Sequence, residues 1–209
     1  MRAVADTRPD VVISFMTISV LAACWLLRVP YIYADHLDVR HLEYSRKWQI
    51  LRNFLLARAS RVTVLSERDR KFLAMYFPKW RASVVYNPAM PADTQKYPRP
   101  AFLEPGKKYV LAVGRLVKQK GFDRLLQAWR RICDDFPNWR LCLIGGGPDE
   151  AELKGLADTL DVQAGVQFVP PIKGLASVYQ HADLYAMSSR AEGFPMVLLE
   201  AMAAGLPAV

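Results

Sequence analysis

Two glutamates near the end of the chain enclose the predicted start of a helix. Glu192 stands three residues before Pro195, and Glu200 stands five residues after it. Proline is favoured in the first helical turn, where its missing N–H costs no hydrogen bond. We therefore expect Glu192 in a loop and Glu200 on the helix, whose free N–H groups and positive dipole end suit a phosphate. Carboxylates beside that phosphate can accept hydrogen bonds from sugar hydroxyls; two acids that pair with surface lysines are the alternative.

A second group of residues suited to phosphate follows an apolar run at 109–113. Arg115 and Lys120 lie in a short segment bounded by Gly114 and Gly121. Two cations can neutralise a diphosphate, and glycines let the backbone turn and approach a ligand. The segment therefore predicts a diphosphate-binding loop, with a solvated basic loop as the alternative.

These side chains must be positioned by the elements around them, and those elements alternate along the chain. Short apolar runs predict strands, and segments of helical periodicity separate them. The alternation is typical of the α/β class, in which helices cover parallel sheets and ligands bind beyond the carboxyl ends of the strands. The expected strands are 11–15, 31–34, 61–65, 83–86, 109–113, 139–144, 166–169 and 184–187, and the expected helices are 18–27, 42–58, 67–77, 122–136, 148–160, 175–181 and 195–204.

The alternation is interrupted once, between residues 87 and 108, by a dense group of prolines. Helix and sheet interiors do not tolerate that density of proline, so this segment is expected to join two domains. We expect an N-terminal domain at 1–90, a linker at 91–108 and a C-terminal domain at 109–209. Both domains are expected to be incomplete, because the first holds only four predicted strands and a last strand begins at residue 206 as the chain ends.

Charge and cysteine content narrow the class of protein. The chain holds 28 Lys and Arg against 20 Asp and Glu, and the whole excess lies in residues 1–100, mostly between Arg40 and Arg81. Such a basic face predicts an anionic partner, for example a membrane surface or a lipid phosphate; a solvated surface is the alternative, and no motif supports nucleic-acid binding. Three cysteines without a Cys-x-x-Cys pair predict neither a disulfide framework nor a metal site, and favour a cytoplasmic protein.

An uncharged stretch from Val11 to Leu27 admits two interpretations. Its 17 residues approach the length of a membrane-spanning helix. However, Ser14, Thr17 and Ser19 interrupt it, and the residues before it are only weakly basic. A buried strand followed by a buried helix is therefore favoured over a signal anchor or a membrane span.

Several short motifs follow one another in the second half of the chain. They are Gly114-Arg115-Leu116, Lys120-Gly121, Ile144-Gly145-Gly146-Gly147-Pro148, Ala182-Asp183, Glu192-Gly193-Phe194 and Glu200-Ala201-Met202. Their order, spacing and strand context resemble the donor-binding domain of retaining glycosyltransferases of family 4. The resemblance implies the GT-B fold with two Rossmann-like domains. It also implies transfer of a sugar, with retention, from a nucleotide-diphosphate sugar to a glycan or lipid-diphosphate-linked acceptor in cell-surface polysaccharide biosynthesis.

The resemblance also implies a role for each site residue. Arg115 and Lys120, which follow Gly114, would hold the donor diphosphate and stabilise the leaving nucleotide. Glu192 would contact hydroxyls of the transferred sugar, and Glu200 would accept hydrogen bonds from the ribose. No metal or other cofactor is implied. The backbone would meet sugar and phosphate oxygens at Gly193, Phe194, Met196 and Val197.

Other positions are less distinctive. The base of the nucleotide would lie near residues 169–173, and the glycine run 145–147 either meets phosphate or only forms a tight turn. In the first half, His36 follows the strand predicted at 31–34, where the family often places a histidine facing the sugar. A structural histidine is the alternative, with Asp35 as a surface acid.

Two further interpretations stay open. A non-catalytic fragment that binds a nucleotide sugar fits the interrupted ends, and a GT-B sugar-nucleotide epimerase is a more distant alternative. GT-B acceptor domains often sit on membranes, so the resemblance gives the basic face a reason: peripheral attachment to anionic lipid on the inner face of the cell membrane.

Overall fold

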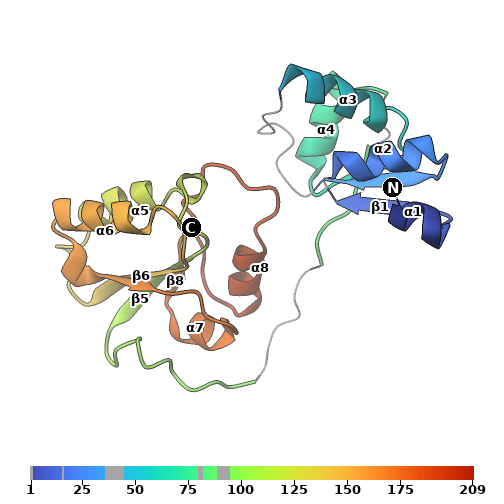
Figure 1. The fold of residues 1–209 in the computed structure, drawn as a ribbon. Helices are drawn as coiled ribbons and strands as arrows, with labels where there is room; N and C mark the ends of the chain where they lie inside the picture. The colour runs from blue at the N-terminus through green and yellow to red at the C-terminus, as the bar shows by residue number, and fades with distance from the viewer. Residues whose placement is uncertain (1, 16, 36–44, 80–81, 89–94) are drawn as a thin grey trace. The chain divides into compact units, whose positions relative to one another are not determined.

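The computed structural model describes residues 2–15, 17–35, 45–79, 82–88 and 95–209. The chain forms two compact units, one of Met1–Pro88 with Glu192–Phe194 and one of Ala89–Ala191 with Pro195–Val209 (Figure 1). Each unit contains its own parallel sheet of four strands, and each is described by itself.

The first unit places its strands in the order in which they occur along the chain. The sheet order is β1-β2-β3-β4, and all three pairs are parallel. Helices connect consecutive strands, as parallel pairing requires. The strands are β1 (Val12–Phe15), β2 (Tyr31–Ala34), β3 (Arg61–Val64) and β4 (Ala82–Val84), and the helices are α1 (Arg2–Thr7), α2 (Ile18–Leu26), α3 (Arg46–Leu56) and α4 (Glu67–Tyr76).

The core of this unit forms where α2 and α3 meet the sheet. Leu21, Tyr33 and Leu55 are fully buried within it. The N-terminus of α4 is capped as expected, because the hydroxyl of Ser66 accepts a hydrogen bond from the N–H of Asp69 over 3.1 Å. The stretch from residue 11 to 27 thus forms a strand and a helix, and no helix in the described residues has both the length and the apolar character to cross a membrane.

The second unit has a different strand order. Its sheet runs β7-β6-β5-β8, again with parallel pairs throughout. The chain moves outward from β5 to β7 and then returns to place β8 on the other side of β5. The strands are β5 (Lys108–Val113), β6 (Trp139–Ile144), β7 (Val166–Val169) and β8 (Leu184–Tyr185); the helices are α5 (Phe122–Arg130), α6 (Glu150–Thr159), α7 (Ala176–His181) and α8 (Met196–Ala203), with 3₁₀ helices η1 (Lys118–Lys120) and η2 (Gln163–Gly165).

Two cores lie on opposite faces of this sheet. Helices α5 and α6 cover one face and α7 and α8 the other (Figure 1). The strands supply both faces because their side chains alternate: Val110 and Ala112 enter one cluster, whereas Tyr109 and Leu111 enter the other. The α/β class and the two parallel sheets that the sequence predicts are therefore confirmed.

Element ends differ from the predictions in places where local turns compete with helix. The helix expected to reach residue 136 ends at Arg130, and most of the following N–H groups bond three residues back, as Ile132 does to Trp129. Two aspartates and a proline follow there and disfavour helix. The short helix α1 was not expected, because its six residues are too few to show a period.

Candidate functional site

A small cavity lies at the carboxyl ends of three adjacent strands of the second unit. Its volume is about 190 Å³, and it opens where β5, β6 and β7 end. Parallel α/β sheets bind their ligands at this edge, so the cavity lies where the sequence predicts a ligand site. It is lined by Val113, Gly114, Arg115, Ile144, Gly145, Gly146, Pro171, Ile172 and Leu175.

Glycines shape the wall of this cavity by allowing backbones to meet. A Cβ on Gly145, whose φ is +155°, would overlap the carbonyl oxygen of Gly114, and one on Gly147 would overlap that of Leu116. The backbones are also hydrogen-bonded, since the N–H of Gly114 donates to Ile144 over 3.0 Å. Close backbone packing thus accounts for two of the three glycines after β6.

One cation, Arg115, lines the cavity, and a second, Lys120, lies against Gly114, which also lines it. Arg115 is exposed and makes no ion pair within the described part of the chain. Lys120 ends η1, and its aliphatic chain folds back over Gly114, where an added Cβ would come within 3.2 Å of Lys120 Cε. Glycine at position 114 therefore lets Lys120 lie beside Arg115, at the end of the same strand.

The loop after β8 is tied to the loop that carries these cations. The guanidinium of Arg190 donates to both carboxylate oxygens of Asp123, over 2.7 and 2.5 Å, and to the carbonyl of Lys118 over 2.6 Å. The hydrogen bonds and charge of Arg190 lower the pKa of the Asp123 carboxyl below its ordinary value. We refer to Asp123 and Arg190 as the clasp.

Backbone contacts reinforce the clasp. The N–H of Arg190 donates to the carbonyl of Gln119 over 2.7 Å, and the Gln119 amide donates to the carbonyl of Ala191 over 2.8 Å. Ser188 donates its hydroxyl to the carbonyl of Lys120 over 3.0 Å. A Cβ at Gly121 would overlap the carbonyl oxygen of Ser188, so the two loops touch closely. Residues 188–191 and 118–123 therefore form one connected structure.

Helix α8 carries Glu200, as the sequence predicts, but the helix begins one residue later than expected. Pro195 is the N-cap rather than the first helical residue, and its carbonyl accepts from the N–H of Leu198 over 3.1 Å. No acceptor among the described residues takes the N–H groups of Met196 and Val197, which is usual for a first helical turn. These two donors remain available to a ligand.

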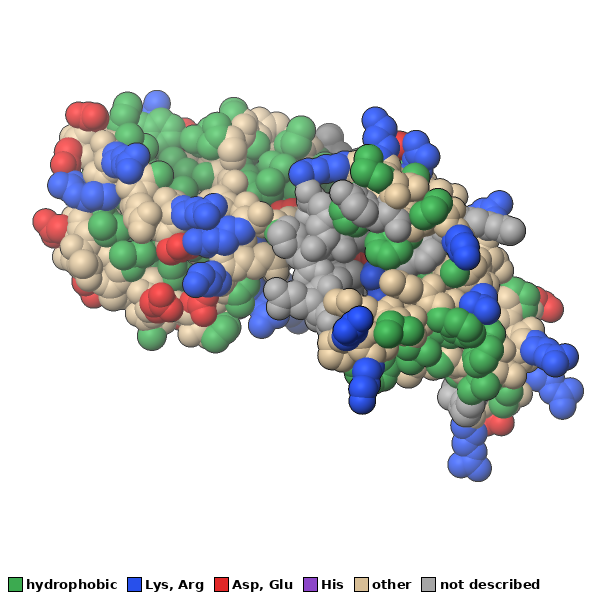
Figure 2. All heavy atoms as spheres, turned by 90° about the horizontal axis from the view of Figure 1, so that it is seen from above, with side chains coloured by type: hydrophobic (Ala, Val, Ile, Leu, Met, Phe, Trp, Pro, Cys, Tyr) green, Lys and Arg blue, Asp and Glu red, His purple; other side chains and the backbone are tan. Residues whose placement is uncertain are grey.

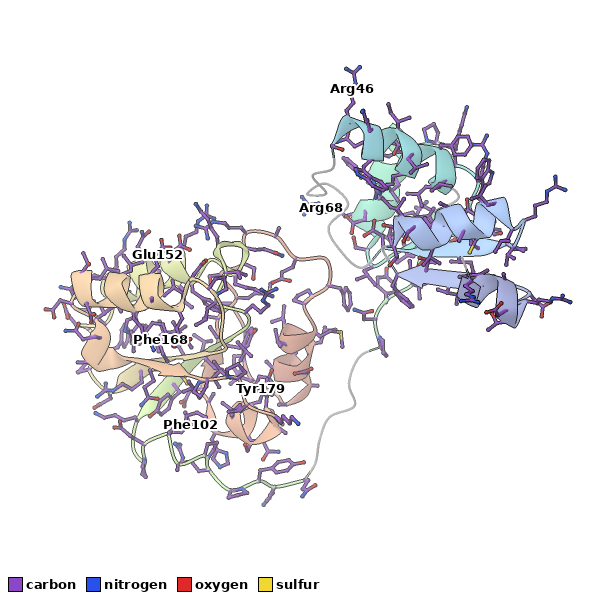
Figure 3. All side chains as sticks on the ribbon, viewed as in Figure 1. Arg46, Arg68, Phe102, Glu152, Phe168 and Tyr179 are labelled. Carbon is purple, nitrogen blue, oxygen red and sulfur yellow. The ribbon has the colours of Figure 1, made fainter. Side chains whose placement is uncertain are left out.

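A buried tyrosine holds the carboxylate of Glu200. Tyr179 projects from α7 toward α8 (Figure 3) and donates its hydroxyl to Glu200 Oε2 over 3.1 Å. Burial raises the pKa of the Tyr179 phenol, and the negative charge of Glu200 raises that pKa further. The phenol therefore stays protonated and available as a donor.

Several expected site residues cannot be related to the cations. His36 lies outside the described residues. Glu192, Gly193 and Phe194 group with residues 1–88 rather than with the unit that holds Arg115. Their roles stay predictions. Within the described residues no cluster of three His, Cys, Asp or Glu could hold a metal ion.

The structure changes the interpretation of two aspartates. Asp35 is buried, 1% exposed, and forms an ion pair with Arg52 over 3.3 Å, so its description as a surface acid is wrong. Asp183, part of a motif in the sequence, accepts a hydrogen bond from the N–H of Tyr109 over 2.8 Å. That contact lies at the amino end of β5, away from the cavity, so Asp183 is structural there.

Sequence reasoning missed the residues that support the site. Asp123 and Arg190 are 67 residues apart and Tyr179 and Glu200 are 21 apart, which no local pattern connects. The sheet topology is the feature that connects these residues. Once β8 is placed beside β5, the loops after both strands must be neighbours.

Comparison with known proteins agrees with this geometry. Residues 93–209 match the family model of glycosyl transferases group 1, and residues 1–92 match the model of glycosyltransferase family 4. This chain belongs to the group 1 glycosyl transferases of family 4. The glycosyltransferase AmsD of amylovoran biosynthesis from Erwinia amylovora is 31% identical to this family 4 chain over 100% of its length and 60% of the relative. An uncharacterised glycosyltransferase from Haemophilus influenzae is 34% identical over 71% of this chain and 41% of the relative.

Solved structures share the GT-B fold of this family 4 chain. HepE from Anabaena, determined with UDP and glucose, has a TM-score of 0.79 at 22% identity and covers 99% of this chain and 61% of its own. The sucrose-phosphate synthase of Thermosynechococcus elongatus has a TM-score of 0.79 at 23% identity, covering 99% and 57%. The chain thus spans about 40 to 60% of the curated relatives named here.

Proposed function

We propose that this chain transfers a sugar, with retention, from a nucleotide-diphosphate sugar to a glycan or lipid-diphosphate-linked acceptor. The observation that carries the proposal is the cavity where β5, β6 and β7 end, which Arg115 lines, with Lys120 lying against the cavity residue Gly114. A diphosphate needs two cations and open N–H groups, and the first turn of α8 supplies such N–H groups in the same unit.

The reaction follows from where charge grows. When the sugar leaves, its ring becomes cationic and the nucleoside diphosphate gains negative charge. Arg115 and Lys120 stabilise that charge more in the transition state than in the ground state, which accelerates the step. Guanidinium and ammonium groups can do this without a metal. Retention by front-face transfer is proposed from the family resemblance.

The remaining residues receive roles within this proposal. Residues 1–90 form part of the acceptor side, 91–108 join the domains and 109–209 form part of the donor side. His36 faces the transferred sugar, and Glu192 accepts hydrogen bonds from its hydroxyls.

The relatives suggest the donor and the pathway class. HepE was solved with UDP and glucose, and AmsD is named for amylovoran biosynthesis. We therefore take uridine diphosphate sugars as the first donors to test, and cell-surface polysaccharide as the product class. A catalytically incomplete fragment that binds the nucleotide sugar is the second candidate. A sugar-nucleotide epimerase, which would change the donor with no acceptor, is the more distant one.

The decisive experiment separates binding from turnover. Calorimetry of the chain with UDP tests the donor site, and absence of binding by UDP, GDP and their sugars would contradict the proposal. Donor hydrolysis followed by NMR then reports the anomer released, and an inverted first product would contradict retention. Binding without turnover supports a fragment that only recognises the donor.

A basic and apolar face on the first unit supports an anionic membrane as partner. Helix α3 exposes Trp48 at 52% and Ile50 at 64%, close to Arg46 and Lys47 in sequence. Figure 2 shows Lys and Arg side chains around hydrophobic ones on this unit. Such faces attach peripherally to anionic lipid, here on the cytoplasmic face of the membrane. Co-sedimentation with phosphatidylglycerol vesicles but not phosphatidylcholine vesicles is expected; equal binding to both would contradict the proposal.

A further inference from the structure

The clasp of Asp123 and Arg190 has the geometry of a positioning device. A guanidinium fork that meets both oxygens of a carboxylate fixes angle as well as distance, which an ammonium cannot do. The same fork also donates to the carbonyl of Lys118, so it fixes the backbone of η1. Arg190 therefore binds two separate points of residues 118–123, the segment that we call the cation loop, with one rigid group.

Stability alone is a weak reason for this pair. The side chains of Asp123 and Arg190 are 35% and 25% exposed, and water screens ion pairs at such positions. An exposed pair of the same type, Arg130 with Asp134, lies at the end of α5 over 2.9 Å and touches no loop of the site. The clasp differs from it by joining the loop after β8 to the start of α5, whereas Arg130 and Asp134 are only four residues apart in the chain.

The residues that follow Arg190 in the chain are the ones that the clasp would position. Ala191 is held by Gln119, and Glu192 is the next residue, about 3.8 Å along the chain from Cα to Cα. Both cations keep a contact that does not involve the clasp side chains: the N–H of Gly114, next to Arg115, bonds to Ile144, and the hydroxyl of Ser188 donates to the carbonyl of Lys120. Loss of the clasp should therefore release the approach to Glu192 more than it disturbs the diphosphate site.

We propose that Asp123 and Arg190 are positioning residues that set the sugar-contacting loop before Glu192 against the cation loop. This inference rests on the proposed function. In this proposal the clasp determines how strongly the protein distinguishes a nucleotide sugar from the free nucleotide, because Glu192, the proposed sugar contact, follows the clasped loop directly in the chain. A displacement of about 1 Å at such a contact can cost about 100-fold in rate.

The test compares the affinity for UDP with that for UDP-glucose, UDP-galactose and UDP-N-acetylglucosamine, by calorimetry on the whole chain. For each UDP-sugar, the ratio of the dissociation constant of UDP to that of the UDP-sugar measures how much the sugar adds to the affinity. In Arg190→Ala and Asp123→Asn this ratio should approach one, while UDP affinity stays within about threefold. Arg190→Lys, which keeps the charge but loses the fork, should fall between these variants and the wild type. Arg130→Ala is the matched control and should behave as the wild type.

Each outcome has one meaning. If Arg190→Ala lowers UDP and UDP-sugar affinity equally, the clasp is merely structural and the inference is overturned. If Arg190→Lys equals the wild type, the fork geometry does not matter and the inference is again overturned. If the wild-type chain binds no nucleotide, the proposed function fails, which is a distinct result. Thermal unfolding of each variant identifies one that does not fold; in that case Arg190→Lys and Asp123→Asn carry the comparison.

Discussion

The phenol of Tyr179 and the carboxylate of Glu200 meet over 3.1 Å between α7 and α8. Tyr179 is 4% exposed, and its hydroxyl also lies 3.4 Å from the carbonyl of Val197. One oxygen of Glu200 is thus occupied by the protein, and the carboxylate is held in one orientation. Two ribose hydroxyls need an acceptor with a fixed direction, so the tyrosine prepares Glu200 for its proposed role.

Replacing this pair should separate ribose recognition from phosphate recognition. Glu200→Ala should weaken UDP binding by about tenfold or more because it removes the proposed acceptor of the ribose hydroxyls, whose hydrogen bonds to a charged group are strong. Tyr179→Phe should weaken binding by only about threefold, because it removes the group that orients Glu200 and leaves the carboxylate in place. Calorimetry with a uridine diphosphate that lacks the ribose 2′-hydroxyl supplies the control. Equal losses for this analogue and for UDP would show that Glu200 does not contact that hydroxyl.

The two cations should act on the chemical step. Arg115→Ala and Lys120→Ala should each lower donor turnover by about 100-fold to 1,000-fold, as the loss of a group that meets developing charge usually does. Single-turnover hydrolysis measures the chemical step directly. Lys118→Ala removes a charge from the same η1 helix and should change turnover by less than about threefold. A comparable loss in that control would point to general electrostatics rather than to specific contacts.

The glycine turn after β6 should be intolerant of a side chain. Gly145→Ala puts a methyl group on the carbonyl oxygen of Gly114 at a φ of +155°, so we expect a loss of about 2 to 4 kcal/mol in unfolding free energy. Gly155 lies within α6 with open space around it, and Gly155→Ala should instead stabilise by about 0.5 to 1 kcal/mol. Chemical denaturation measures both. A neutral Gly145→Ala would show that the two turns can separate without cost.

The clasp should also have a pH signature. The pKa of Asp123 is lower in the folded protein than its ordinary value of 3.8. Its stabilising contribution is therefore complete above the ordinary value and disappears as the pH falls through the lower, folded value. The difference in unfolding free energy between wild type and Asp123→Asn should be constant above about pH 5 and shrink below about pH 4. A difference that grows on acidification would contradict the assignment.

Breaking the buried ion pair of the first unit should be costly. Asp35 and Arg52 are 1% and 7% exposed, so removing either partner leaves a buried charge and should destabilise by about 3 to 5 kcal/mol. Asp35→Asn with Arg52→Met should cost less than either Asp35→Ala or Arg52→Ala. Urea denaturation of the three variants and the wild type provides the test. A double variant that loses as much as Asp35→Ala and Arg52→Ala together would contradict a stabilising interaction between the two side chains.

The sequence predicted the helices and strands well wherever the spacing of apolar residues agreed with the positions of glycine, proline and other residues that end such elements. The strands at 31–34, 139–144 and 166–169 were located to the residue, because buried parallel strands appear as short apolar runs between breakers. Helix ends were predicted less well, as at Arg130, where the chain continues in tight turns whose N–H groups mostly bond three residues back.

Of the candidate site, the sequence predicted only the residues that would contact a ligand directly. Arg115, Lys120 and Glu200 carry charges that a ligand would contact, so residue type points to them. Tyr179 and Arg190 act on other residues, and such a role depends on neighbours that only the fold brings together. Asp35 is a second example of this limit. It was expected at the surface but is buried beside Arg52, and no local sequence pattern predicts that a single acidic residue will be buried.

The position of β8 beside β5 affects the order in which the protein assembles. During synthesis β5, β6 and β7 emerge first and can pair with their neighbours in sequence, whereas the clasp must wait for a partner 67 residues away. Closing so long a loop costs entropy that only the finished sheet can repay. The clasp, and with it the link between the two loops of the candidate site, is therefore expected to form after β5, β6 and β7 have paired.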